Sequence, residues 1–210
     1  MSAREHVAQQ PPRTDLAGFP AHRLSDRQDL FRAHRRDLGP WWFGNDRGGR
    51  FDLTAPRGTC YLADDALVAV RERLGLVLGA EPFVPASLLE DAVVSRLRAP
   101  REHRLADLQD RVAGDFGVTR ELETMTPYAV PQAWARGFAD ASFEGVRYGP
   151  RFSTGEAGAV ALFGDEGGRD WPVDDRPVPA AEVPGAPTAV PTPRRDELTV
   201  VRTPRTRTRR

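Results

Sequence analysis

The sequence predicts a single domain of mixed α and β structure (α+β). Its 210 residues suffice for one domain of ordinary size but not comfortably for two. Short apolar runs alternate with stretches of helical periodicity between two polar ends that contain prolines. We therefore expect residues 19–173 to form the domain, with disordered segments over residues 1–18 and 174–210.

A strand followed directly by a helix is expected near residue 60. The run of residues 60–63 predicts the strand, and Asp64 or Asp65 would cap the helix that follows. Apolar residues recur at helical spacing up to Leu74, and Gly75 marks the end.

The next part of the chain predicts two helices and a strand. Pro85 is expected to open a helix that runs through Ala92, and residues 105–108 predict a strand. Residues 128–141 predict a helix with Trp134 on its apolar face. Core packing is the simpler role for this indole, although stacking on a cofactor is the alternative.

Two strands are predicted near the end of the domain, over residues 145–148 and 159–163. The polar loop GPRFSTGEAG separates them. A hairpin, or two neighbouring strands, would bring this loop to one rim of the sheet.

The basic residues are all arginine, since lysine is absent. This excludes a Walker-type phosphate loop, a lysine Schiff base and a kinase-like strand lysine. Any phosphate must be bound by arginine, hydroxyl groups or backbone N–H groups. The net charge of zero gives no global attraction to nucleic acid or membrane, which leaves only the terminal run TPRTRTRR for such a contact.

Other site classes and locations are also disfavoured. The four histidines show no ligand spacing and no tie to a nucleophile, so we expect no metal and no hydrolase triad. The single cysteine, Cys60, excludes an internal disulfide and is expected to be a buried strand thiol. Without an apolar leader or a membrane-length segment, the protein is expected to be cytoplasmic.

The residues between Gly48 and Glu72 fit a dinucleotide pocket. Gly48 and Gly49 allow the backbone to approach a ligand, and Arg50 offers a planar fork for pyrophosphate oxygens. Tyr61 follows eleven residues later and Glu72 eleven after that. A tyrosine can stack on nicotinamide, and a carboxylate can stabilise the oxocarbenium character of a breaking ribosyl bond.

Each of these residues also fits a simpler structural role. Arg50 could be a surface ion-pair residue, Tyr61 a core aromatic and Glu72 a solvated charge. Only their combination favours a site.

This run resembles the RES domain, the toxin half of RES–Xre toxin–antitoxin pairs. The resemblance rests on GGRF, then YLA and the A-x-x-E that ends at Glu72. It continues through HR at His22-Arg23, PYAVPQAWA, EGVRYGPRFS and AVALFG, and so covers roughly residues 20–166.

The resemblance implies an ADP-ribosyltransferase-like split sheet with surrounding helices. It also implies an enzyme for which NAD is the substrate, cleaved by water or by inorganic phosphate, and a Xre-type antitoxin as partner; a homodimer is an open alternative. The catalytic residues that it implies are Arg50, Tyr61 and Glu72. The NAD-binding residues that it implies are Arg23, Gly49, Phe51, Tyr148 and Arg151.

One motif position departs from the family. A gapless match places Pro150 where a serine is expected, and proline supplies neither a hydroxyl nor an N–H. Ser153 could serve if the loop shifts register, or Arg151 could bind the phosphate. Two alternatives follow: a RES-fold binding or regulatory module with impaired catalysis, or an enzyme that transfers ADP-ribose to a macromolecule.

Overall fold

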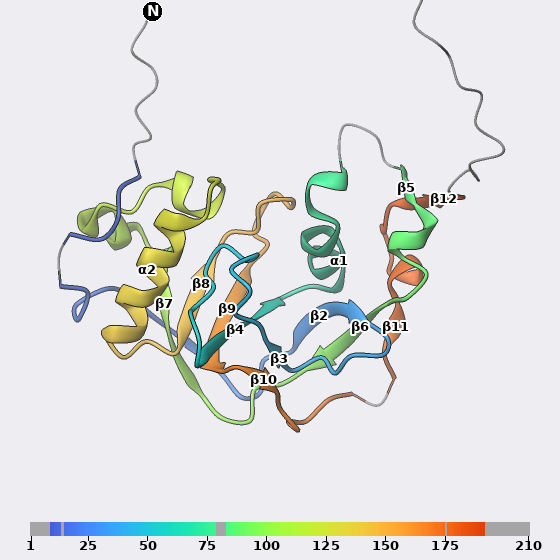
Figure 1. The fold of residues 1–210 in the computed structure, drawn as a ribbon, viewed down its shortest axis with the longest axis horizontal. Helices are drawn as coiled ribbons and strands as arrows, with labels where there is room; N and C mark the ends of the chain where they lie inside the picture. Colours follow the sequence, from blue (N-terminus) through green and yellow to red (C-terminus); the bar gives the residue numbers. More distant parts are fainter. Residues whose placement is uncertain (1–8, 14, 79–82, 175, 192–210) are drawn as a thin grey trace, which may run out of the picture.

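A mixed eight-stranded sheet forms the centre of the part of the chain that the computed structural model describes, residues 9–13, 15–78, 83–174 and 176–191 (Figure 1). In spatial order its strands are β1 (Ala21–Leu24), β7 (His103–Asp107), β8 (Gly145–Tyr148), β9 (Ala159–Asp165), β4 (Arg57–Ala63), β2 (Leu30–Arg35), β6 (Ala92–Leu97) and β11 (Val178–Pro179).

Smaller elements flank this sheet. β3 (Trp42–Phe43) pairs with β10 (Gly167–Gly168), and β5 (Phe83–Pro85) pairs with β12 (Thr188–Val190). The two α-helices of the described residues are α1 (Ala66–Leu74) and α2 (Ala129–Asp140). Short 3₁₀ turns occupy Gly75–Leu78, Ala86–Leu88, Arg111–Phe116, Arg120–Glu123 and Ala180–Glu182.

The large sheet is split between β4 and β2. β4 pairs with β9 along its whole length, whereas β4 and β2 meet at one residue pair, Phe31 and Ala63. Helix α2 lies beside β7 and β8, and α1 lies beside β2 and β6 on the other side of the split (Figure 1). The α+β class and the single domain are therefore confirmed, and the divergence of β2 from β4 leaves room for a ligand.

Separate apolar clusters hold the two sides together. Trp134 and Phe138 of α2 are fully buried and pack with Phe19. The Trp134 indole N–H donates to the carbonyl oxygen of Gln10 at 2.7 Å, so core packing is the role of this residue. Val70 of α1 is buried against apolar residues of β5 and β6.

The predicted strand and helix near residue 60 are confirmed. Residues 60–63 lie in β4, where Cys60 is fully buried. Asp65 caps α1, because its carboxylate accepts from the backbone N–H groups of Leu67 and Val68. Gly75 ends the helix with a φ of +55°, which favours glycine. Three more strands and one more helix are confirmed, with ends within about two residues of those predicted. The strands were predicted over residues 105–108, 145–148 and 159–163, and the helix over residues 128–141.

The predicted helix from Pro85 to Ala92 is wrong. Pro85 ends strand β5, only a single 3₁₀ turn follows, and Ala92 begins β6. The apolar spacing of this segment was ambiguous, and the β-branched run that follows Ala92 favours a strand beside β2.

The folded part extends beyond residues 19–173 in both directions. Gln9 and Leu16 are buried, and Gln9 is held by hydrogen bonds with Thr119 and Glu121. At the other end, Ala180 and Val183 are buried in the same apolar cluster as Val70 of α1. Extended, proline-containing segments thus pack on the domain where a disordered lead-in and tail are expected from composition. Residues 1–8 and the terminal run TPRTRTRR lie outside the described residues.

Candidate functional site

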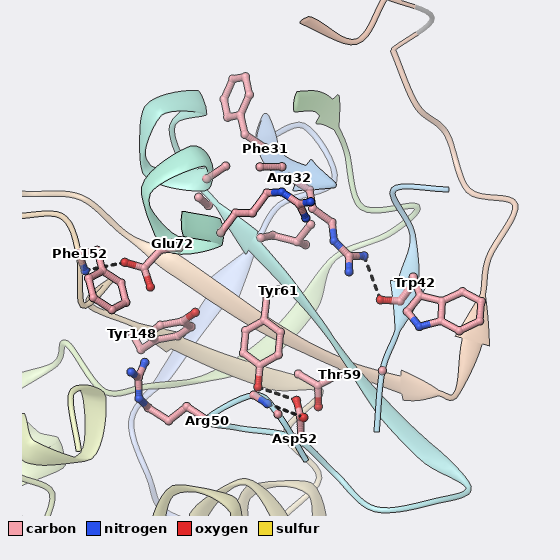
Figure 2. Close-up of a pocket in the computed structure, with 18 of the residues that line it drawn as sticks. Phe31, Arg32, Trp42, Arg50, Asp52, Thr59, Tyr61, Glu72, Tyr148 and Phe152 are labelled. Carbon is pink, nitrogen blue, oxygen red and sulfur yellow. Dashed lines mark hydrogen bonds between the residues drawn. The ribbon is translucent and has the colours of Figure 1, made fainter. Parts of the chain in front are cut away.

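The split between β4 and β2 contains a cavity of about 660 Å³ (Figure 2). This volume is in the range of small-molecule and cofactor sites. Six residues that the sequence singles out line it together: Gly48, Gly49, Arg50, Tyr61, Glu72 and Tyr148. They come from the loop before β4, from β4 itself, from α1 and from the end of β8.

Tyr61 is fixed by the loop that carries Arg50. Its hydroxyl donates to Asp52 Oδ1 at 2.8 Å and accepts from the backbone N–H of Phe51 at 2.8 Å. Burial raises the pKa of Tyr61 well above its ordinary value, and the charge of Asp52 adds to the rise. Tyr61 is therefore a neutral phenol locked in one orientation.

Gly49 is required by this arrangement and does not offer its backbone to a ligand. A Cβ atom at this position would lie 2.4 Å from both Asp52 Oδ1 and the Tyr61 hydroxyl. The Gly49 N–H donates to Asp52 Oδ2 at 2.8 Å, and the Gly48 N–H donates to Asp46. The backbone N–H groups of Gly48 and Gly49 are therefore already bonded to aspartate side chains. Protein side chains, and not a ligand, make the close approach that the glycines allow.

Gln132 of α2 anchors the same loop from the opposite side. Its amide nitrogen donates to the carbonyl oxygens of Arg47 and Gly49, at 3.1 and 3.0 Å. The side chain is buried, so these bonds are shielded from water. Gln132 and Asp52 were not among the residues that the sequence predicts for the site. The one available signal for Gln132 was a polar residue among the apolar positions of the predicted helix.

Glu72 projects from α1 into the cavity beside Tyr148 (Figure 2). Its Oε1 accepts from the backbone N–H of Phe152 at 2.7 Å. Burial raises the pKa of Glu72, while the backbone N–H groups of Phe152 and Arg151 and the charge of Arg50 act in the opposite direction. The loop after β8 therefore contacts the site through Phe152.

Arg50 is a buried cation without an acidic partner. Arg50 is only 7% exposed, and its guanidinium lies 5.5 Å from the centre of the Tyr128 ring. Within the described residues, no carboxylate lies within 4.0 Å of it, and its buried Nε has no hydrogen-bond partner. Since a buried charge is costly unless paired, this site is suited to an anionic ligand.

The structure does not bring the remaining predicted residues to the cavity wall. Arg23 lies on β1, with β7, β8 and β9 between it and β4, and its side chain is 88% exposed. Phe51 is a core residue that packs on Tyr148, with the ring centres 5.0 Å apart. The hydroxyl of Ser153 is buried without a partner, and Arg151 lies over the Phe152 ring.

An arginine that the sequence analysis did not select does line the cavity. Arg32 lies on β2, across the split from Tyr61. The family resemblance predicts an NAD-binding arginine near the start of the domain and places it at Arg23. Arg32 meets the same description, and only the pairing of the strands distinguishes the two positions.

No metal site accompanies these residues, since no group of three or more His, Cys, Asp or Glu side chains within the described residues could hold an ion. In that same part of the chain, no helix has the length and apolarity needed to cross a bilayer. The cavity thus combines the half-buried carboxylate of Glu72, the buried guanidinium of Arg50, which lacks an acidic partner, and the phenols of three tyrosines, Tyr61, Tyr128 and Tyr148. This set complements a ligand with a phosphate and an electron-poor ring.

Comparisons with known proteins agree with this arrangement. A chain in the crystal structure of the M. tuberculosis MbcT–MbcA toxin–antitoxin complex superposes with a TM-score of 0.60 at 14% sequence identity. The match covers 78% of this chain and 91% of that one, which shows a common fold. Comparison with curated proteins gave no match. The family model described as the RES domain matches residues 29–181, most of the chain, and this protein therefore belongs to the RES domain family.

Proposed function

We propose that this domain cleaves the bond between nicotinamide and ribose in NAD, with water or inorganic phosphate as the acceptor. The observation that carries the proposal is that Glu72, Arg50 and three tyrosines line one cavity. Membership of the RES family and the shared fold with a chain from a toxin–antitoxin complex support it.

Glu72 is the group that would stabilise the transition state. As the C–N bond lengthens, its electron pair leaves with nicotinamide and positive charge develops on the ribose. An ionised carboxylate stabilises that charge, and the N–H of Phe152 holds one carboxylate oxygen in place. Attack by water gives ADP-ribose and a proton, whereas attack by phosphate gives a phosphorylated ADP-ribose.

Arg50 would bind a phosphate oxygen of the substrate. Its guanidinium is buried and lacks an acidic partner in the described part of the chain, so an incoming phosphate would supply the missing counter-charge. Tyr61 and Tyr148 then provide apolar ring surface for the nicotinamide ribose end.

Incubation of the purified protein with NAD, with and without phosphate, tests the proposal. We expect free nicotinamide under both conditions. ADP-ribose should accompany it without phosphate, and a phosphorylated ADP-ribose should accompany it with phosphate if phosphate is the preferred acceptor. Mass spectrometry identifies the products. Arg50→Gln should lose most of the activity, and Arg111→Gln, an exposed arginine far along the chain, is the matched control. Undiminished NAD under both conditions would contradict the proposal.

The two alternatives give different results in the same assay. Pro150, buried directly after β8, motivates the impaired module, which would bind NAD without releasing nicotinamide. Transfer to a macromolecule would release nicotinamide and leave label from adenine-labelled NAD on protein or nucleic acid. We favour turnover to small products, because Glu72 and Arg50 meet in the cavity without any contribution from position 150.

We further propose a separate antitoxin as partner, because the similar solved chain was crystallised in a toxin–antitoxin complex. A short neighbouring reading frame with a helix-turn-helix sequence would be the candidate. Co-expression should restore growth that this chain suppresses, and Glu72→Gln should remove the need for rescue. If Glu72→Gln suppressed growth as strongly as the wild type, the toxicity that the antitoxin relieves would not come from the proposed activity.

A further inference from the structure

The cavity has a second, cationic end that the proposed bond cleavage does not use. Figure 2 shows Glu72, Tyr148 and Phe152 grouped at one end and Arg32 and Trp42 at the other. Arg73, which follows Glu72 on α1, lines the same cavity. We call Arg32, Trp42 and Arg73 the β2–β3 end.

Arg32 is held in place by the segment that carries Trp42. Its Nη1 donates to the carbonyl oxygen of Trp42 at 2.9 Å, to that of Pro40 and to the sulfur of Cys60. Its other guanidinium nitrogens have no acceptor in the described part of the chain, and no carboxylate lies within 4.0 Å there. A guanidinium oriented in this way by backbone groups is preorganised for a ligand.

Arg73 adds a second uncompensated cation. Partial desolvation lowers the pKa of Arg73, and the charges of Arg35 and Arg32 lower it further. Arg32 and Arg73 line the same cavity. Arg35 is bound to Asp37 at 2.6 Å, but Arg32 and Arg73 have no such partner among the described residues. The dipole of α1 favours a cation in its last turn, yet it does not account for Arg32. An anion bound between the two arginines would relieve their repulsion.

Trp42 supplies an exposed aromatic side chain at the rim of the same cavity. Its neighbour Trp41 is a core residue with its indole N–H bonded to Pro172, whereas Trp42 is 51% exposed at the cavity rim. Gly44 and Gly168 lie beside the indole, where a Cβ atom would come within 4.0 Å of it. An exposed indole together with guanidinium groups that lack an acidic partner is the combination that binds a base and its phosphates.

We propose that the β2–β3 end binds the adenosine half of the dinucleotide. Trp42 stacks on the adenine base, and Arg32 with Arg73 binds the phosphate next to the adenine ribose. This inference rests on the proposed function for the identity of the substrate, and it fixes the orientation: the nicotinamide ribose lies at Glu72 and the base lies at β3.

Kinetics with two substrates test this orientation. Nicotinamide mononucleotide carries the same scissile bond as NAD but lacks the adenosine half. For NAD, Trp42→Ala and Arg73→Gln should each raise KM about 10-fold or more with kcat nearly unchanged, as expected for a lost base stack or phosphate contact. For the mononucleotide, neither variant should change kcat/KM. Arg71→Gln, two residues away on α1 and outside the cavity lining, is the control. Equal losses with both substrates, or no loss with NAD, would overturn the inference.

Binding of ADP separates this inference from the proposed function. Calorimetric titration of ADP into the wild-type protein should show binding that Trp42→Ala and Arg73→Gln weaken about 10-fold or more. If NAD is not cleaved but this pattern is found, the orientation stands and the proposed chemistry fails. If ADP does not bind, or binds all variants equally, the orientation is wrong.

Discussion

Glu72 is the residue whose charge the proposed reaction needs. Burial raises the pKa of this carboxyl, so on acidification it takes up its proton at a higher pH than an ordinary glutamate does. We therefore predict that kcat/KM falls on the acid side with a midpoint above about 4.3, the usual glutamate value. A pH–rate profile measured where circular dichroism shows a folded chain checks this. An acid limb at or below that value would contradict the role of Glu72.

Asp52 is predicted to act as a positioning residue through Tyr61. In Asp52→Ala, the Tyr61 hydroxyl and the Gly49 N–H both lose their acceptor, so the loop that carries Arg50 should loosen. We expect kcat/KM to fall by about 10-fold or more, in line with the cost of misplaced site residues. Asp52→Asn keeps one side-chain oxygen acceptor and should retain more activity than Asp52→Ala. Equal activity of all three proteins would exclude this role.

The sequence identified Arg50, Tyr61 and Glu72 because these residues belong to short motifs with definite spacing. It did not identify Asp52, Gln132 or Arg32, because their importance depends on what they meet in space. Arg32 and Arg23 both lie on short strands near the start of the domain, but β2 borders the split and β1 is the edge of the sheet. Such a difference is a property of strand order, which local sequence does not encode.

Among the helices and strands, the sequence predicted secondary structure correctly where a segment carried an apolar pattern together with residues that mark its start and its end. The strand and helix at residues 57–74 have an apolar run, an Asp cap and a terminal glycine, and all three features act as expected. Residues 85–92 offered apolar spacing alone, without a cap or a stop, and pairing of β6 with β2 decided their structure. A split sheet was expected only from the family resemblance, and the position of the split between β4 and β2 came from the structure.

The link between α2 and the glycine loop is predicted to matter for stability. Gln132→Ala leaves the carbonyl oxygens of Arg47 and Gly49 without their buried donor. We expect a loss of about 1–3 kcal/mol in the free energy of unfolding, measured by urea denaturation. Arg136→Ala, at an exposed position of the same helix, is the control. Equal stability of the two variants would show that this link is not needed.

For the whole molecule, residues 15–18 are predicted to be part of the fold. Leu16 is 4% exposed and packs in the same apolar cluster as Trp134 and Phe138 of α2. Leu16→Ala should therefore lower the free energy of unfolding by about 2–5 kcal/mol. For a chain of this size, each kcal/mol lowers Tm by roughly 2–4 °C. Leu38→Ala, at a position 49% exposed, should leave Tm nearly unchanged. If both variants melt together with the wild type, this segment contributes little to the domain.

In the proposed reaction, the cavity in the split sheet cleaves NAD through the charge of Glu72. Glu72→Gln keeps the shape of the side chain and removes the charge. Because burial raises the pKa of Glu72, ionisation of this group opposes folding at neutral pH, and the neutral glutamine should not lower stability. Glu90→Gln, at an exposed position between β5 and β6, is the matched control.

Nicotinamide release from NAD by these three proteins is the most direct measurement. We predict equal rates for wild type and Glu90→Gln. For a folded Glu72→Gln we predict a loss of 100-fold or more, roughly 2.7 kcal/mol of transition-state stabilisation. Release of nicotinamide by Glu72→Gln at the wild-type rate would contradict this prediction.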